Sequence, residues 1–386
     1  MRSFVFALAL PVVAVAAHVA AGCSASSNGT LAPSAGADSG AGADSGADAG
    51  AIQPAACTAT PPPGLAVASL DLLGHPPYAA DGCTLVYVAA AEGGASGDLR
   101  ARDLATGAET VLAPASESPR RPSVAGDVVA WEASENGAAV VRVHTAGATF
   151  TASGAFDHAT EPRAAADAVV FTAWLGAADT SDTDVVVLDP TTRAARTVLG
   201  GPGQQRFADV SKGTIAATDF SEDPDGTFND NETDLADIVL FDRATSAVTH
   251  RPRTGKQAFP MLASSSRLGY LDWGLVHPEP KLAAYALRAG DLGGPPEADV
   301  LIANVTDASG QYVLPTGRGG VLAWVDRPLG GVATLWQAPA DLSTPAAATP
   351  GLSGLELFAP VVTGSFMVLA TRPTAGGAVV LTSVAR

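Results

Sequence analysis

Short apolar runs separated by turns fill most of the chain, from residue 64 to residue 386. The stretch from Pro122 to Trp131, PSVAGDVVAW, shows the pattern in miniature. A strand of small residues leads into a Gly-Asp turn, and an apolar strand that ends in an aromatic residue follows. Such a pattern predicts a tight β-hairpin, because apolar runs of this length flanked by turn residues are typical of strands.

Versions of this hairpin recur along the chain, at spacings of roughly 40 to 53 residues. The other copies are Tyr78–Val88, Pro162–Trp174, Phe207–Phe220, Pro260–Trp273, Tyr312–Val325 and Pro360–Ala370. Repeats of this period indicate an architecture built from one supersecondary unit.

A second pattern follows the hairpin in several of the units. An apolar strand ends in Asp-x-x-Thr, and another short strand follows, as at Asp103, Asp189 and Asp242. An Asp at the start of a turn accepts hydrogen bonds from nearby backbone N–H groups and so favours the reversal. Each unit therefore holds four strands, here called a, b, c and d, and almost no helical periodicity is present.

Repeated four-stranded units predict an all-β fold, a β-propeller that we expect to have seven blades. Six or eight blades, or a pair of β-sandwiches, are the alternatives. The small-residue strand, the VVAW-type strand and the V-L-D-x-x-T hairpin together resemble the TolB-like propeller repeats of bacterial envelope proteins. The resemblance covers roughly residues 64–386 and implies a propeller that works in the cell envelope.

The seventh unit stops one strand short at Arg386. The segment Leu65–Leu73 precedes the first unit and has no blade of its own. We expect it to supply the missing outer strand of the last blade, which would close the ring and remove two open edges.

The first residues read as an export signal. Residues 1–22 place one Arg before an apolar stretch that ends in small residues, which is the order of a secretory signal. The small residues before Cys23 resemble a bacterial lipobox, with Ala20 where that pattern usually has Leu. We expect Cys23 to be lipidated, so that the protein is anchored to the membrane; a plain signal peptide or an uncleaved anchor is the alternative.

Residues 24–56 repeat ADSGA-like units and contain almost no large apolar residue. Such a segment is expected to be a disordered tether, and residues 57–386 are expected to form the propeller domain. Export also places Cys57 and Cys83 in an oxidising compartment, where we expect them to form a disulfide. Alternating strand order would bring the two onto one face of the ring; two free buried thiols are the alternative.

The chain has a formal net charge of −17. This charge argues against nucleic acid as a partner and against docking on anionic lipid headgroups. A cationic partner or a divalent metal stays open, as does a role in solubility alone. We expect a monomer in the periplasm or on the outer surface.

One loop stands out by its composition. The b–c loop of the fourth unit, Asp219–Asp237, is rich in acidic residues and holds no Lys or Arg. Its Asp and Asn side chains recur at short spacing around Gly226, and hard oxygens of this kind are the ligands that Ca²⁺ prefers. The hypothesis is a Ca²⁺ site, and the alternative is a solvated insertion; the candidate ligands are Asp223, Asp225, Asn229, Asn231 and Asp234.

The search for catalytic motifs is negative: the sequence has no G-x-S-x-G, H-E-x-x-H, C-x-x-C or P-loop. No catalytic residue is therefore proposed. Strand-a residues such as Arg163, Asp209 and Tyr312 are candidates for lining a central channel, and structural roles are the alternative. The aromatic strand ends, Tyr87, Trp131, Trp174, Trp273 and Trp324, are expected to pack between blades.

These features favour a lipid-anchored, non-enzymatic binding or scaffold module for an envelope protein, a peptide or a glycan. A propeller enzyme of the glycosidase or lyase type is the second reading, which needs two carboxylates facing each other across a cleft. A structural lipoprotein without a small ligand is the third reading.

Overall fold

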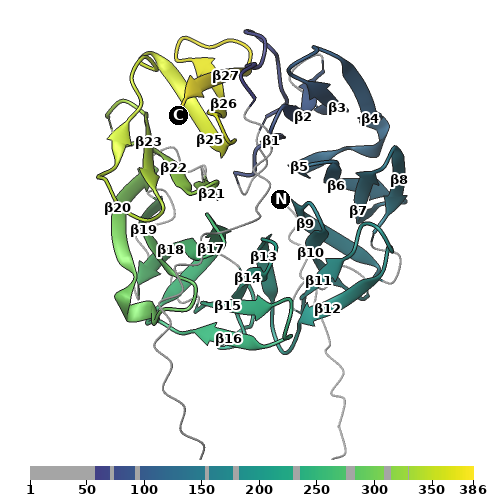
Figure 1. Cartoon of the computed structure of the whole chain (residues 1–386), viewed down its shortest axis with the longest axis vertical. Helices are drawn as coiled ribbons and strands as arrows, with labels where there is room; N and C mark the ends of the chain where they lie inside the picture. Colours follow the sequence, from purple (N-terminus) through teal and green to yellow (C-terminus); the bar gives the residue numbers. More distant parts are fainter. Residues whose placement is uncertain are drawn as a thin grey trace, which may run out of the picture. The chain divides into compact units, whose positions relative to one another are not determined.

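The computed structural model describes residues 57–69, 74–91, 96–152, 156–176, 182–228, 235–274, 283–307, 314–328 and 330–386. The expected signal, Cys23 and the tether lie outside the described residues. Within the described ranges the strands form seven antiparallel sheets, arranged as blades around an axis (Figure 1). In this part of the chain no helix is long and apolar enough to span a membrane.

The first four blades have four strands each, in chain order. Blade 1 contains β1 (Tyr78–Asp81), β2 (Thr84–Ala90), β3 (Ser96–Asp103) and β4 (Glu109–Ala113). Blade 2 contains β5 (Arg120–Ala125), β6 (Val128–Glu135), β7 (Ala138–Thr145) and β8 (Ala148–Thr151). Blade 3 contains β9 (His158–Ala165), β10 (Ala168–Trp174), β11 (Asp184–Leu188) and β12 (Ala195–Leu199). Blade 4 contains β13 (Gln205–Val210), β14 (Thr214–Asp219), β15 (Asp237–Asp242) and β16 (Val248–Arg251).

Blades 5 and 6 follow the same order, and blade 7 has three strands. Blade 5 contains β17 (Lys256–Leu262), β18 (Arg267–Gly274), β19 (Ala283–Asp291) and β20 (Val300–Asp307). Blade 6 contains β21 (Thr316–Arg318), β22 (Val321–Asp326), β23 (Thr334–Pro339) and β24 (Ala347–Ala348). Blade 7 contains β25 (Leu355–Val362), β26 (Phe366–Pro373) and β27 (Val380–Ala385). Two short 3₁₀ turns, η2 (Ala115–Glu117) and η3 (Pro296–Ala298), lie between strands.

The predicted hairpins are confirmed, and so are their turns. In the a–b hairpin of blade 2, Ala125 pairs with Val128, and Gly126 adopts a φ of 55°, which suits a residue without a Cβ. In the c–d turn of blade 1, Asp103 Oδ1 accepts hydrogen bonds from the backbone N–H groups of Ala105 (2.8 Å) and Thr106 (3.2 Å). These bonds hold the pKa of Asp103 below its usual value, because they favour the charged form.

The hydrophobic core lies between neighbouring blades. Trp131 of blade 2 packs with Val86 and Leu99 of blade 1, and its side chain is fully buried. Tyr87 and Trp324 are also buried, so the expectation that these aromatic residues pack between blades is confirmed. Trp174 and Trp273 are only partly buried, and Trp174 stacks on His158 with ring centroids 4.9 Å apart.

An N-terminal segment completes blade 7, as predicted. The backbone N–H of Val67 donates to Val379 O (3.1 Å), and the N–H of Leu381 donates to Leu65 O (2.9 Å), so the segment takes the outer position beside β27. The paired stretch is shorter than the predicted strand, because Ala68 N–H already donates to Val88 O of blade 1 (3.0 Å). The closing segment therefore holds the two ends of the ring together.

The sequence on the N-terminal side explains why this closing strand is short. Three consecutive prolines, Pro61, Pro62 and Pro63, precede Leu65. Proline has no backbone N–H and cannot donate to a strand ladder, so these residues cannot extend the pairing along β27. Proline beside a sheet edge also discourages pairing with another chain.

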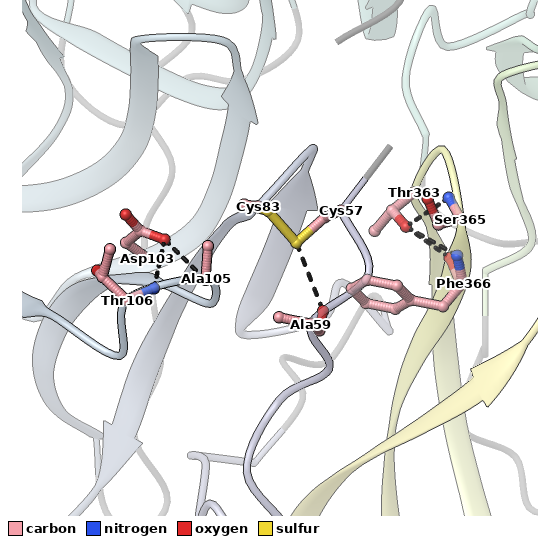
Figure 2. Close-up of a disulfide and its surroundings, with 9 residues drawn as sticks. All are labelled: Cys57, Ala59, Cys83, Asp103, Ala105, Thr106, Thr363, Ser365 and Phe366. Atoms are coloured by element: carbon pink, nitrogen blue, oxygen red, sulfur yellow. Dashed lines mark hydrogen bonds between the residues drawn. A yellow bond between two sulfur atoms is a disulfide. The ribbon is translucent and has the colours of Figure 1, made fainter. Parts of the chain in front are cut away.

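A disulfide anchors the start of this segment. Cys57 and Cys83 are bonded to each other, with Cα atoms 4.9 Å apart, which confirms the predicted pair. Figure 2 shows Cys57 beside the a–b turn of blade 1, which holds Cys83, and near the a–b turn of blade 7, which holds Thr363 and Phe366. The disulfide and the closing segment thus fasten the same seam, between blades 7 and 1.

Candidate functional site

The first strands of blades 2 to 5 share an irregularity at the end that faces the b–c loops. In β5, β9, β13 and β17 the register with the second strand shifts, as it does at a β-bulge. One residue of each bulge has a left-handed backbone: Arg121 (φ 50°), Glu161 (57°), Phe207 (55°) and Phe259 (55°). Residues other than glycine seldom adopt this conformation, which is strained and is concentrated at functional sites.

A bulge re-aims the side chain that it carries. Neighbouring first strands contact one another around the axis, and Figure 1 places them nearest the centre of the ring. The four bulge residues therefore meet side chains of adjacent blades. We name the resulting group the axial cluster; it comprises Arg120, Arg121, Glu132, Glu161, Arg206, Phe207, Phe228 and Phe259.

The half of the axial cluster on blades 2 and 3 is ionic. Glu132 is 1% exposed, and its carboxylate accepts hydrogen bonds from Arg120, Arg121 and the hydroxyl of Thr160. The same Arg121 nitrogen, Nη1, lies 3.2 Å from Glu132 and 3.8 Å from Glu161. One guanidinium therefore bridges two buried carboxylates from adjacent blades.

Glu161 continues the network into blade 4. Its Oε1 lies 2.5 Å from Nη2 of Arg206, and its Oε2 accepts hydrogen bonds from Phe207 N–H (3.3 Å) and from the Thr172 hydroxyl (3.1 Å). Burial by itself raises the pKa of Glu161, but the charges of Arg206 and Arg121 outweigh it, so this pKa lies below its usual value. Glu161 is therefore a carboxylate at neutral pH.

The half on blades 4 and 5 is aromatic. The rings of Phe207 and Phe259 lie 4.2 Å apart, and Phe228 packs edge-on against Phe207 at 5.1 Å. The Arg206 guanidinium lies 4.7 Å from the Phe207 ring centre, and Lys256 Nζ lies 4.6 Å from that of Phe228. Cations at these distances from aromatic rings are attracted to the ring faces.

Phe228 reaches this position from the b–c loop of blade 4. Its backbone N–H donates to Gln204 Oε1 (2.8 Å), and the backbone N–H of Gln204 donates to Gly226 O (2.8 Å). Gln204 is 1% exposed, so both bonds are shielded from water. The loop chosen from the sequence for its acidic residues thus contributes an aromatic side chain to the axial cluster.

Two of the five candidate Ca²⁺ ligands lie among the described residues. Asp223 is 8% exposed, and each of its carboxylate oxygens accepts a hydrogen bond from a backbone N–H of the loop. Asp225 similarly accepts from Thr227 N–H (2.9 Å). Asn229, Asn231 and Asp234 lie outside the described residues. Among the residues that are described, no group of three or more His, Cys, Asp or Glu side chains is placed to hold a metal ion, and the Ca²⁺ site stays a prediction.

The buried side chain of His75 lies under the influence of several arginine charges. It is 4% exposed, and its pKa is lowered well below the ordinary value, first by burial and then by the charges of Arg121, Arg163 and Arg206. Three guanidinium groups from blades 2, 3 and 4 therefore act on one neutral imidazole. The charge of Arg163 is one cause of the lowered pKa of His75, and its predicted place in a central channel stays a prediction.

At the opposite end, the side chain of Arg318 crosses the axis. Arg318 belongs to β21 of blade 6, yet it donates to Val124 O of blade 2 (3.1 Å) and lies 3.4 Å from Asp81 of blade 1. Asp81 also accepts from Gly126 N–H (2.7 Å). These contacts brace the ring at the a–b turns. The opposite end of the ring, which holds the axial cluster, is therefore the candidate site for a ligand.

The other predicted strand-a residues have different outcomes. Asp209 accepts a hydrogen bond from Leu262 N–H (2.7 Å) and so ties blade 4 to blade 5, and burial raises its pKa. Tyr312 lies outside the described residues. Glu132 lies in β6, is buried, and pairs with Arg120 and Arg121.

Sequence reasoning missed the bulge residues, although a signal was present. Pro122, Pro162 and Pro260 stand inside first strands, and proline within a strand indicates an edge or a bulge. Arg121, Glu161 and Phe259 each come directly before the first residue of a repeat copy, whereas Phe207 is the first residue of its own copy. The loop residue Phe228 had no such signal.

Comparison with known proteins supports the fold. No protein-family model and no curated protein matches the chain. Among solved structures, the β-propeller domain of the trilobed protease from Pyrococcus furiosus is 10% identical, with a TM-score of 0.56 over 83% of this chain and 93% of that one. An oligogalacturonate lyase in complex with manganese is 11% identical, with a TM-score of 0.50 over 86% and 95%.

TolB proteins are also among the structural neighbours. A putative TolB from Agrobacterium tumefaciens is 13% identical, with a TM-score of 0.43 over 64% of this chain and 84% of that one. Likeness at this level adds nothing to the fold, and the resemblance to TolB-like repeats stays a prediction. The propeller domain of a protease and a lyase share this fold, so the fold by itself does not select a function.

Proposed function

We propose that this protein is a lipid-anchored β-propeller of the cell envelope that binds a protein, a peptide or a glycan without catalysing a reaction, and that the axial cluster is its binding site. The observation that carries the proposal is the pairing of Glu132 and Glu161 with Arg120, Arg121 and Arg206. The strained bulges support the location, because strain of this kind is retained where side chains must be aimed.

The pairing argues for binding rather than acid–base catalysis. A general acid at neutral pH needs a carboxyl group whose pKa is raised. The pKa of Glu161 is instead held below its usual value, and both of its oxygens accept hydrogen bonds. Charged and aromatic side chains side by side are typical of recognition surfaces.

The location in the envelope is supported by the disulfide. Disulfides persist in oxidising compartments and are rare in the cytosol. The Cys57–Cys83 bond therefore fits an exported protein. Lipidation at Cys23 and the tether of residues 24–56 complete the proposal, in which the propeller is held near a membrane but does not span it.

Affinity capture from envelope extract, with the full-length chain as bait, tests the proposal. We expect a partner that is lost when Phe228→Ala and Arg206→Gln are combined. Arg267→Gln is the matched control, since Arg267 pairs with Asp291 far from the axial cluster along β18 (3.3 Å). Capture that is equal with all three baits, or no capture at all, would contradict a binding role for the cluster.

A propeller enzyme of the glycosidase or lyase type is the second candidate. It is favoured by the two carboxylates of Glu132 and Glu161, which lie 3.2 Å and 3.8 Å from the same nitrogen of Arg121. Structural likeness to an oligogalacturonate lyase is consistent with it but shows the fold alone. Turnover of an oligosaccharide that Glu161→Gln abolishes, with folding intact, would favour this candidate over the binder.

A further inference from the structure

The ionic half of the axial cluster carries more cationic than anionic groups. Arg120, Arg121 and Arg206 share two carboxylates, those of Glu132 and Glu161. The Arg120 side chain is 55% exposed although it pairs with Glu132, so part of its guanidinium faces solvent. The whole chain has a net charge of −17, and a local cationic excess is therefore a departure from the rest of the molecule.

The positive field extends inward along the axis. Arg163 acts on His75 together with Arg121 and Arg206, and their charges lower the pKa of the imidazole. A planar guanidinium binds a carboxylate through two parallel N–H donors, which makes arginine the preferred residue for such groups. This environment therefore suits a ligand that brings its own carboxylate.

Two aromatic rings lie close enough to Arg206 for a single sugar ring to contact both the guanidinium and an aromatic face. The Arg206 guanidinium lies 4.7 Å from the centre of Phe207 and 5.9 Å from the centre of Phe228. Phe228 is partly exposed, whereas Phe207 and Phe259 are buried beneath it. A ligand that reaches Arg206 therefore meets the ring of Phe228 at the same time.

We propose that the axial cluster binds a short acidic oligosaccharide, in which Arg206 binds a uronic-acid carboxylate, Phe228 packs against the C–H face of the same sugar, and Arg120 adds a second positive charge that attracts the ligand. The inference rests on the proposed function and names its ligand class. One uronic-acid residue carries a carboxylate and an apolar face on a single rigid ring. An Asp or Glu side chain of a peptide offers the carboxylate alone.

The surrounding loops limit the length of this ligand. Glu135, Asp182 and Asp225 are exposed on the b–c loops. A long polyanion would be repelled by these side chains, whereas a charge that lies more than about 8 Å from them is largely screened at physiological salt. Recognition of a short oligosaccharide or of a chain end follows from this arrangement.

Isothermal titration of the full-length chain with an oligouronate and with a neutral oligosaccharide of the same length tests the proposal. We expect the acidic sugar to bind at least ten times more tightly than the neutral one, and to bind more weakly as salt rises. Loss of a charge-assisted hydrogen bond weakens binding by roughly 10- to 100-fold. Both Arg120→Gln and Arg206→Gln should show such a loss, and Arg267→Gln should bind like the wild type.

Arg120→Gln keeps the test valid if Arg206→Gln fails to fold, because Arg120 is the more exposed of the two. Equal binding of neutral and acidic sugars, or wild-type affinity in both variants, would overturn the inference. So would an oligoglutamate peptide that binds as tightly as the sugar and competes with it.

The outcomes also separate this inference from the proposed function. If the chain binds no sugar but captures an envelope protein through the axial cluster, the inference fails and the binding module stands. If the chain both binds and cleaves the acidic sugar, the ligand class stands and the non-enzymatic role fails.

Discussion

The seam between blades 7 and 1 provides the sharpest test of how this ring is held together. Among the described residues a short segment at Leu65–Val67 pairs with the outer edge of β27, and the Cys57–Cys83 disulfide anchors that segment. Replacing both cysteines with serine removes the anchor and leaves every strand in place. The closing segment then has to find its position on β27 without a covalent constraint.

The magnitude follows from the separation of the two cysteines, which is 26 residues. A disulfide that closes a loop of that length lowers the conformational entropy of the unfolded chain. On the chain-entropy estimate, this stabilises the folded state by about 3.5 kcal/mol at 25 °C. Unfolding entropy of about 2.1 cal/mol/K per residue, over the unit of residues 52–386, converts this loss into a fall in Tm of about 5 °C.

Thermal unfolding of the full-length chain measures the loss of stability, and hydrogen exchange measures the loosening of the closing segment. We expect the double variant to melt about 5 °C lower, and reductant to lower the wild type to the same value while leaving the variant unchanged. In the double variant, the amide of Leu381, which donates to Leu65 O, should exchange faster than it does in the wild type. The amides of β15 serve as the internal reference. A Tm within 1 °C of wild type, or unchanged protection at Leu381, would refute the reasoning.

Three further predictions concern the seam between blades 7 and 1, the axial cluster and the acidic loop. Tyr78→Phe should lower the unfolding free energy by about 2 kcal/mol, because the Tyr78 hydroxyl donates to Ala359 O and accepts from Ala370 N–H across the same seam; denaturant titration measures it, and no change would contradict it. Glu161→Gln should cost about 3 kcal/mol at pH 7 by leaving Arg206 unpaired in the interior. Since the folded pKa of Glu161 is depressed, its stabilisation is present above about pH 4.3 and is lost as pH falls through the folded pKa; stability measured against pH should therefore be flatter in this variant, and a parallel curve would argue against the ion pair. Calcium titrated into the full-length chain should release or absorb heat and raise the Tm if the fourth-blade loop binds it, and Asp225→Asn should weaken this response; no heat and no shift would end that hypothesis.

The hairpin at Pro122–Trp131 shows why the fold could be predicted from the sequence. Its turn at Gly126 and its apolar strand are local features, since a turn needs particular backbone angles and a buried strand needs apolar side chains. Repetition of the same local features then implies the ring, because each blade must cover the apolar faces of its neighbours. The same reasoning predicted the disulfide and the closing segment.

The axial cluster could not be predicted in this way. Arg121, Glu161 and Phe207 lie far apart in the sequence, and their contacts depend on the rotation from one blade to the next. Glu132 could be seen in the sequence, but its inward direction could not, because the alternation of faces along β6 is fixed only by pairing with its neighbours. Phe228 enters the cluster only because its loop folds back onto Gln204.

For this protein, the sequence by itself determined the strands, the seven-fold repetition and the Cys57–Cys83 disulfide. The strands and their repetition depend on residues that are close together in the chain, and the disulfide depends on a count of cysteines. Only the tertiary structure decided which side chains face the axis. The bulges at Arg121, Glu161, Phe207 and Phe259 rotate these side chains out of the regular alternation of a strand. Ring geometry then places charges from blades 2 to 4 beside aromatic rings from blades 4 and 5, a juxtaposition that no local pattern encodes.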